Sequence, residues 1–365
     1  MRSQVMVIGG YGHVGQQICL QLSEVYPGQI VAAGRSYEKA EKFSRQTKGK
    51  VRPYQLDVSE SSYSEWMDKT KLVIMCLDQE DPSFAETCLR SGIDYIDISA
   101  KGAYMEQLAK LNHQYIGATA LLSVGLAPGL TNLLAAKAAS MLSSVNQIDI
   151  GIMLGMGDQH GKAAIEWTLD NVHTDYVLTK HHQRKRVKSF TGGKRIDFGR
   201  SLGKRHAYHF PFSDQQTLPS TLRVPTVTTR LCFDSRVATR ALAFTRSLGM
   251  TSFLNLPKIK ERAISMIQSA QMGTDQYAVK VEAKGMDGNK VHQAALGIKG
   301  RDESQATAQV ASAAALHLLS RRFQTGVFHI EELFSLAYEN GDFALVDQTT
   351  NEKRVLALRA SLLTA

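Results

Sequence analysis

The sequence predicts an α/β fold, in which a doubly wound parallel sheet of the Rossmann type is followed by an α+β domain with an antiparallel sheet. Two observations predict it. Strand-like and helix-like patterns alternate with short connections through the first 125 residues. The run Leu72–Leu77 is almost wholly apolar, as expected of a strand that is buried on both faces of a parallel sheet. At 365 residues the chain is long enough for two domains.

The first strand-like run, Gln4–Gly9, leads directly into a glycine-rich turn of the form G-x-G-x-x-G, and a helical pattern follows. Gly10 allows a sharp exit from the strand, Gly12 lets a pyrophosphate approach the backbone, and Gly15 lets the helix pack closely on the strand. His13 and Val14 lie at the helix N-terminus, where free N–H groups favour phosphate. The context on both sides of the turn predicts dinucleotide binding; the alternative is a tight turn that binds nothing.

The second strand, at 29–34, ends in Gly34, Arg35 and Ser36. An Asp or Glu usually ends this strand in NAD-binding folds, where it accepts a hydrogen bond from the ribose 2′-OH. No acidic residue stands here, and an arginine with a neighbouring hydroxyl suits a 2′-phosphate. The sequence therefore predicts NADP in preference to NAD, unless Arg35 is only a solvated loop residue.

The remaining elements of the first domain follow in alternation. Further strands are predicted at 51–56, 72–77, 94–98 and 118–124, and helices at about 38–48, 60–68, 82–91 and 103–115. Six strands in total are expected in this sheet, which occupies a Rossmann domain over residues 1–125.

The pattern changes after Gly125, where an alanine-rich helix ending near Leu142 precedes several strand-like runs. These runs lie at 148–153, 223–233, 277–283 and 291–298, with a hairpin signal at Asp287-Gly288. We expect residues 126–304 to form an α+β domain that carries substrate and dimerises. An alanine-rich helix at about 305–325 is expected to complete the first domain, and 326–365 forms a C-terminal segment with no assigned structure.

Composition describes a soluble globular protein, with 43% hydrophobic and 21% charged residues. The four cysteines form no C-x-x-C pair and are expected to be reduced, as in a cytoplasmic protein, and no metal site is expected. The first strand begins almost at Met1, and no long uncharged apolar run is present, so neither a signal peptide nor a membrane span is expected.

The net charge of +9 is concentrated in one segment, residues 180–205, which holds ten Lys/Arg and one acid, Asp197. This segment is either a solvated hairpin rim or a basic surface for an anionic partner. No aromatic residues are interleaved in a nucleic-acid-binding pattern, so nucleic acid is not the expected partner.

In an open α/β sheet, ligands bind outside the carboxyl ends of the strands. Beyond the first two strands, this rule selects residues after the third, fourth and fifth strands as cofactor-binding candidates. They are Asp57, Val58, Cys76, Leu77, Ser99 and Ala100. Asp57 is as readily explained as a helix cap.

Lys101 is the best candidate for a general acid or base in the first domain, since a desolvated lysine can exchange a proton near neutral pH. In the second domain, Asp158 is a candidate proton shuttle and His160 a candidate substrate ligand, both in a glycine-rich turn that needs no function. Arg230 stands within an apolar strand, where its charge needs a partner; a substrate carboxylate is one possibility.

Four segments resemble the saccharopine dehydrogenase-like NAD(P)-binding oxidoreductases, in particular the branch of lysine 6-dehydrogenases and saccharopine reductases. They are Val7–Gly15, Asp94–Ser99, Val124–Leu134, and the turn Gly155–Asp158 with Trp167-Thr-Leu downstream. The resemblance implies hydride transfer between a nicotinamide and a C–N bond. It also implies an amino-acid-like substrate on the second domain, a homodimer, and adenine contact by Asp57.

The sequence is compatible with three functions. The leading hypothesis is an NADP-dependent oxidoreductase that acts on an amine or imine of an amino-acid-like substrate. The alternatives are an NADP-binding regulator without turnover, acting through the basic segment, and a carbonyl or enoyl reductase on the same scaffold.

Overall fold

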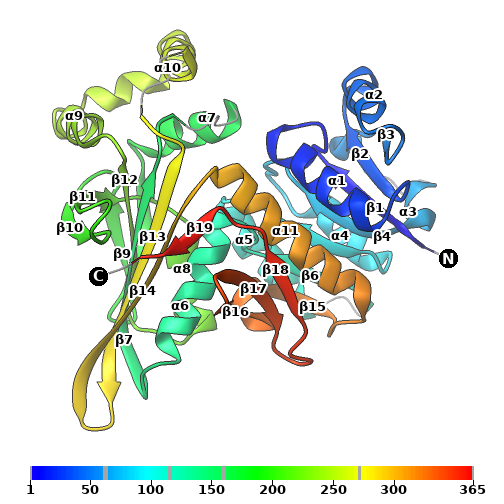
Figure 1. The fold of residues 1–365 in the computed structure, drawn as a ribbon. Helices are drawn as coiled ribbons and strands as arrows, with labels where there is room; N and C mark the ends of the chain where they lie inside the picture. Colours follow the sequence, from blue (N-terminus) through cyan, green and yellow to red (C-terminus); the bar gives the residue numbers. More distant parts are fainter. Residues whose placement is uncertain (1, 61–64, 114–116, 158–161, 270–272, 364–365) are drawn as a thin grey trace. The chain divides into compact units, whose positions relative to one another are not determined.

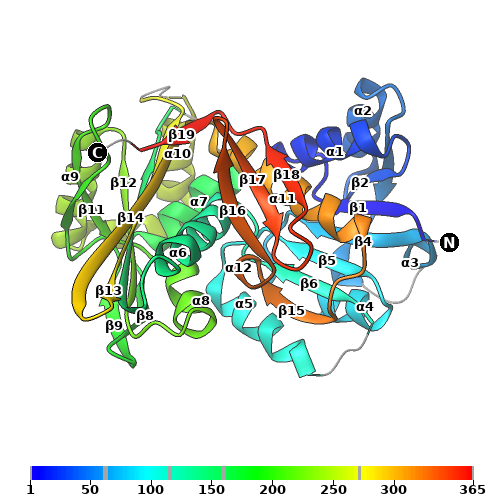
Figure 2. The ribbon, with the colours of Figure 1, turned by 60° about the horizontal axis from the view of Figure 1, so that its bottom comes forward.

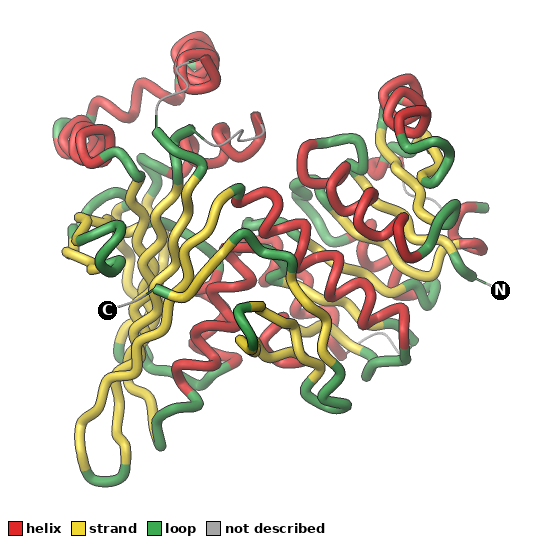
Figure 3. The backbone as a smooth tube through the Cα atoms, in the orientation of Figure 1, coloured by secondary structure: helices red, strands yellow, loops and turns green. Residues whose placement is uncertain are grey.

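The computed structural model describes residues 2–60, 65–113, 117–157, 162–269 and 273–363 (Figures 1 and 3). The chain forms two compact units. The first consists of Met1–Leu130 and Ser304–Leu358, and the second of Thr131–Glu303 and Arg359–Ala365. Each unit is built around its own seven-stranded sheet.

The sheet of the first unit is parallel throughout and has the strand order β15-β6-β5-β4-β1-β2-β3. Its strands are β1 (Gln4–Ile8), β2 (Ile30–Gly34), β3 (Val51–Gln55), β4 (Thr70–Met75), β5 (Asp94–Asp97), β6 (Thr119–Leu122) and β15 (Gly326–His329). The apolar run that predicts a buried strand is β4, in which Leu72 to Met75 are fully buried. The predicted Rossmann-like sheet is confirmed.

Helices cover both faces of this sheet, as a doubly wound fold requires. The first unit contains α1 (His13–Val25), α2 (Tyr37–Gln46), α3 (Trp66–Lys69), α4 (Ser83–Arg90), α5 (Gly102–Ala109), α12 (Ile330–Leu333) and, from Ser304 on, α11 (Glu303–Ser320). Trp66, Phe84 and Tyr104, from α3, α4 and α5, pack in one core with Met6 of β1. Ser304 at the start of α11 accepts a hydrogen bond from Gln17 of α1, 3.3 Å away.

The C-terminal part of the chain adds structure that the sequence pattern did not predict. β15 pairs with β6 and makes a seventh strand where six were expected. Three further strands, β16 (Phe334–Glu339), β17 (Asp342–Asp347) and β18 (Lys353–Leu356), form a small antiparallel sheet (Figure 2). β15 is only four residues long and runs directly into α12, so it shows no period of its own.

The sheet of the second unit has the order β10-β11-β12-β7-β13-β14-β19. Its strands are β7 (Ser144–Leu154), β10 (Lys194–Asp197), β11 (Lys204–His209), β12 (Val227–Phe233), β13 (Gln276–Asp287), β14 (Lys290–Arg301) and β19 (Ala360–Leu362). It is mostly antiparallel, as predicted, but β12 and β7 pair in parallel, and this pair was not foreseen. β12 begins four residues later than the predicted strand at 223–233, because Pro225 interrupts its start.

A hairpin and five longer helices complete the second unit. They are β8 (Asp175–Lys180) with β9 (Gln183–Lys188), and α6 (Thr131–Ala139), α7 (Lys162–Asn171), α8 (Asp214–Thr221), α9 (Arg236–Ser247) and α10 (Pro257–Ser269). The turn at Asp287-Gly288 joins β13 to β14 as the sequence predicts, with Gly288 at φ +58°. Within the described residues, no helix combines the length and apolar character needed to cross a membrane.

Candidate nucleotide site and a cavity in the second unit

The glycine-rich turn follows β1 and is packed so tightly that it excludes larger residues. The Gly9 N–H donates to the Ala33 carbonyl at 2.8 Å, which ties the turn to β2. A Cβ on Gly15 would meet the Gly9 carbonyl oxygen and lie 2.8 Å from the Gly10 Cα. Gly15 therefore lets α1 begin directly against the turn, which is the role the sequence predicts for it.

The N-terminus of α1 is open to an anion. Gly12 is its N-cap residue, no side chain caps it, and its first turn holds no acidic residue. The free N–H groups and the positive end of the helix dipole at this point attract a phosphate. Val14 lies in this first turn, and His13 forms a hydrogen bond through Nε2 with the Ser304 hydroxyl at 2.9 Å.

The end of β2 is shaped by Tyr11, a residue for which the sequence predicts no role. The Ser36 N–H donates to the Tyr11 hydroxyl at 3.1 Å. A Cβ on Gly34 would come within 2.5 Å of that hydroxyl oxygen, so the tyrosine occupies the space that a side chain at residue 34 would need. Its only signal in the sequence is its place between two glycines of the turn.

Beside Tyr11, Arg35 is exposed and forms no ion pair with an acidic side chain of the described residues. The Ser36 hydroxyl accepts a hydrogen bond from the Lys39 N–H at 3.3 Å and so caps α2. The end of β2 thus offers a guanidinium that forms no ion pair with a described residue, although its charge helps to lower the pKa of the Asp57 carboxyl.

The candidates after the third and fourth strands have local structural roles. Asp57 accepts hydrogen bonds from the backbone and side chain of Ser59, at 3.0 and 2.7 Å, and these bonds lower the pKa of its carboxyl. Val58 begins the short 3₁₀ helix Val58–Glu60. Burial raises the pKa of the Cys76 thiol far above its usual range, which makes it a poor nucleophile. The Leu77 side chain lies beside Gly9, and it would contact a Cβ at that position.

The loop after β5 is anchored by a buried polar network. Asp97 accepts hydrogen bonds from the Tyr95 hydroxyl and the Ser99 N–H, both at 2.8 Å, and the Tyr104 hydroxyl lies 3.3 Å from that of Tyr95. Burial raises the pKa of the Asp97 carboxyl. The network fixes the course of Ser99 and Ala100 toward Lys101. Tyr104, from the following helix, is a member that the sequence did not reveal.

Lys101 stands immediately before α5 and pairs with acidic side chains of the loop after β4. Its Nζ lies 2.8 Å from a Glu80 carboxylate oxygen and 4.0 Å from one of Asp78. About one third of its side chain is exposed. Burial raises the pKa of the Asp78 carboxyl, while Lys101 opposes that rise.

These loops meet at one edge of the sheet. Ile8 is in register with Ala33 and with Met75, and Met75 with Asp97, so the chain leaves β2, β1, β4 and β5 side by side. The candidate residues of the first unit, from Gly10 to Lys101, therefore surround the carboxyl ends of neighbouring parallel strands.

In the second unit, Arg230 has internal partners. Its guanidinium donates to Asp149 at 3.2 Å, to the Thr228 hydroxyl at 3.0 Å and to the Gly192 carbonyl at 3.3 Å. Asp149 therefore balances the arginine charge without a substrate, although a substrate role for Arg230 stays a prediction. Asp158 and His160, the other two candidates of this unit, lie outside the described residues.

His209 completes this polar cluster. The Arg230 guanidinium lies 3.3 Å from His209 Nε2, which must accept the hydrogen bond because an arginine can only donate. Burial, followed by the Arg230 charge, lowers the pKa of the histidine to about 4. Within the described ranges, no group of three or more His, Cys, Asp or Glu side chains is arranged to hold a metal ion.

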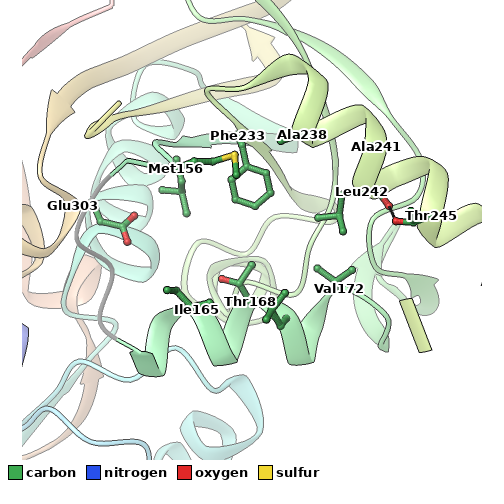
Figure 4. A pocket seen from close by; sticks show the side chains of 12 residues that line it. Met156, Ile165, Thr168, Val172, Phe233, Ala238, Ala241, Leu242, Thr245 and Glu303 are labelled. Atoms are coloured by element: carbon green, nitrogen blue, oxygen red, sulfur yellow. Dashed lines mark hydrogen bonds between the residues drawn. The ribbon is translucent and has the colours of Figure 1, made fainter. Parts of the chain in front are cut away.

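A cavity of about 350 Å³ opens in the second unit at the carboxyl ends of the parallel pair β7 and β12 (Figure 4). Figure 4 shows α9 on one side of it and α7 on the other. The lining residues are Leu154, Met156, Ile165, Thr168, Leu169, Val172, Phe233, Ala238, Ala241, Leu242, Thr245 and Glu303. Among the described residues of this lining, Glu303 alone is ionisable, and its carboxylate lies at one end of the cavity.

The glycine turn, the uncapped helix and the converging strand ends define the first unit as a dinucleotide-binding domain. Residues 5–121 match the family model described as the saccharopine dehydrogenase NADP-binding domain. The first unit thus contains an NAD(P)-binding domain similar to that of the saccharopine dehydrogenases, as the sequence predicts.

Two solved structures share the fold. Saccharopine dehydrogenase (L-Glu forming) from Saccharomyces cerevisiae is 13% identical, with a TM-score of 0.58 over 90% of this chain and 94% of that one. Homospermidine synthase from Legionella pneumophila, solved in complex with NAD, is 12% identical, with a TM-score of 0.61 over 91% and 87% of the two chains. No curated protein matches the sequence.

Three expectations from the sequence stay predictions. They are the preference for NADP, the homodimer and the cytoplasmic location.

Proposed function

We propose that this protein is an NADP-dependent oxidoreductase that transfers a hydride to or from a C–N bond of an amino-acid-like substrate. The observation that carries the proposal is the glycine turn with an uncapped helix N-terminus, next to an unpaired arginine at the end of β2. The two structural neighbours are named as saccharopine dehydrogenase and homospermidine synthase, which supports a nitrogen-containing substrate.

The residues present fit a bound NADP. The N–H groups at the start of α1 would hold the pyrophosphate, since no side chain competes for them. Arg35 would hold the 2′-phosphate, and the absence of a side chain at Gly34 removes the carboxylate that would repel it. The cofactor, when bound, supplies a nicotinamide that exchanges a hydride at C4.

This assignment predicts that Arg35→Ala discriminates between the two nicotinamide nucleotides. A hydrogen bond to a charged group contributes about 1.5–3 kcal/mol, so the variant should bind NADPH about 10- to 100-fold more weakly. Its affinity for NADH should be unchanged. Both affinities are measured by quenching of intrinsic fluorescence.

Arg45→Ala is the matched control, because Arg45 is an exposed arginine of the adjacent helix α2 that forms an ion pair with Glu41. It should leave both affinities unchanged. An Arg35→Ala variant that binds NADPH as tightly as the parent, or loses NADH affinity to the same extent, contradicts recognition of the 2′-phosphate.

Conversion between an amine and an imine moves one proton with each hydride, so the site needs a group that exchanges protons. We propose Lys101 for this role, since it ends the loop after β5. Glu80 holds its ammonium group at 2.8 Å and so fixes its position at the start of α5. Asp158, in the second unit, stays a second candidate for the proton-exchanging group.

We propose that the cavity of the second unit receives the apolar part of the substrate. Its volume of about 350 Å³ falls within the usual range of about 300–1,000 Å³ for ligand pockets. Apolar side chains line it, and the Glu303 carboxylate at one end suits the ammonium group of an amino compound. The proposal therefore favours an amino acid with an apolar side chain over a dicarboxylic one.

A substitution that fills the cavity provides the test. Leu242→Trp should raise the KM for an apolar amino acid at least about tenfold. One methylene more or less in an apolar pocket already changes the binding free energy by about 1–3 kcal/mol, and the indole ring is much larger than a methylene. NADPH affinity should not change. The substrates to compare are leucine, phenylalanine, lysine and glutamate, with turnover followed by the absorbance of NADPH.

Phe244→Trp is the control for this experiment, because Phe244 lies on the same helix but is 64% exposed. It should leave the KM unchanged. Turnover of carbonyl compounds but of no amine would contradict the proposed reaction. Equal KM values for the two tryptophan variants would contradict the use of the cavity.

A further inference from the structure

The structure divides the basic segment 180–205 into two parts with different surroundings. One part forms the hairpin of β8 and β9, where Arg184, Lys185 and Lys188 are exposed. The other part lies on β10 and β11 and lines a hollow of about 250 Å³ in the second unit. The segment is therefore not one uniform rim.

Five lysine and arginine side chains line this hollow, and they come from two distant stretches of the sequence. The lining residues are Arg195, Lys204, Arg205, His206, Cys232, Phe233, Arg236, Thr239 and Arg240. Arg236 and Arg240 belong to α9, one helical turn apart, and lie outside the basic segment. Folding thus adds two cations to a stretch that is already strongly positive.

Little negative charge balances these cations. Asp197 lies 3.7 Å from Lys204, and Arg205 donates to the carbonyl oxygens of Leu202 and Asp234, at 3.0 and 2.6 Å. No ion pair joins Arg195, Arg236 or Arg240 to an acidic side chain in the part of the chain that the structure describes.

The helix that supplies two of these arginines also begins at the hollow. α9 has 12 residues, its first turn holds no acidic side chain, and its N-cap Ser235 accepts from the Ala238 N–H at 3.2 Å. The positive end of the helix dipole adds to the guanidinium charges, and the Asp234 carboxylate, which accepts from the Ser235 N–H at 2.8 Å, offsets only part of this positive charge.

We infer that this hollow binds a small anion that carries phosphate groups, either free polyphosphate or the phosphate end of a small ester. Guanidinium groups bind phosphate oxygens through paired hydrogen bonds, and several unpaired ones converge here. A volume of about 250 Å³ suits a few phosphate groups and is below the usual range for a larger organic ligand. The site is independent of the proposed nucleotide site, which lies in the other unit.

Calorimetric titration with inorganic triphosphate tests the inference. The parent should bind it at a single site in 150 mM salt, and the double variant Arg236→Gln/Arg240→Gln should bind it at least about tenfold more weakly. The control Arg184→Gln/Lys185→Gln removes the same charge from the exposed hairpin and should change the affinity less than about twofold. Unfolding midpoints and NADPH affinity should be the same in all three proteins, which shows that folding and the nucleotide site are intact.

The alternatives give different results. If both double variants lose triphosphate affinity to the same extent, the attraction is diffuse and the inference is overturned. The inference is also overturned if the parent does not bind triphosphate. A single-stranded oligonucleotide that binds more tightly than triphosphate, and loses affinity mainly in the hairpin variant, also overturns it in favour of a nucleic-acid surface. Competition between triphosphate and a phosphate monoester such as glycerol phosphate distinguishes free polyphosphate from the end of an ester.

Discussion

Gly15→Ala is expected to abolish NADPH binding and to lower the free energy of unfolding by about 1–3 kcal/mol, the usual effect of overpacking. The added methyl group would meet the Gly9 carbonyl oxygen and lie 2.8 Å from the Gly10 Cα. These neighbours are backbone atoms held by the Gly9–Ala33 hydrogen bond, so the turn itself must shift. Fluorescence titration with NADPH and urea unfolding measure the two effects.

Gly49→Ala separates this steric effect from a general loss of glycine. A Cβ at residue 49 would meet no described atom within 4 Å. The substitution would strain the backbone through the φ of +80° at this residue. This variant should lose about 1 kcal/mol of stability, the usual range for a left-handed residue, and should keep its NADPH affinity. If Gly15→Ala binds NADPH as the parent does, the glycine turn is not the cofactor site.

Local patterns in the sequence were sufficient for the first six strands of the parallel sheet and for its glycine turn. A strand buried on both faces has to be apolar along its length, as Leu72–Met75 is, and the turn requires its glycines at fixed spacing. The rule that ligands bind at the carboxyl ends of strands then selected the loops after β1, β2, β4 and β5.

Contacts between distant residues could not be predicted in the same way. Tyr11 occupies the space beside Gly34, and β15 pairs with β6 although about 200 residues separate them. A seventh strand of four residues shows no detectable period, and the register of a sheet follows from packing rather than from the pattern of one strand.

The two charged features of the second unit show the same limit. A charge within an apolar strand indicates that Arg230 needs a partner, but nothing in the sequence indicates Asp149, 81 residues earlier. The basic segment 180–205 is evident in the sequence, but the sequence does not indicate that part of it meets the arginines of α9. Charge can be counted along a sequence, whereas its neutralisation depends on which strands become neighbours.

Asp149→Asn is expected to lower the free energy of unfolding by about 3 kcal/mol or more, as is usual when a buried ion pair loses one partner. The Asp149 side chain is 6% exposed and the Arg230 side chain 12%. Burial alone would raise the pKa of Asp149, but the Thr228 hydrogen bond and the charges of Lys194 and Arg230 lower it below its ordinary value. The carboxylate therefore stabilises the fold at neutral pH, and the stabilisation is lost as the pH falls through the lowered pKa. Urea unfolding of both proteins measures the difference.

Asp197→Asn provides the comparison, because Asp197 is more exposed and lies 3.7 Å from a solvated lysine, Lys204. Exposed pairs contribute about 0–1 kcal/mol, so the free energy of unfolding of this variant should lie within about 1 kcal/mol of that of the parent.

The two variants, Asp149→Asn and Asp197→Asn, also test the role of Arg230. If the main role of Arg230 is to bind a substrate carboxylate, Asp149→Asn should change the KM for the substrate and leave stability almost unaffected. If its charge is balanced internally, stability should fall, and NADPH affinity should remain that of the parent, because Asp149 belongs to the second unit.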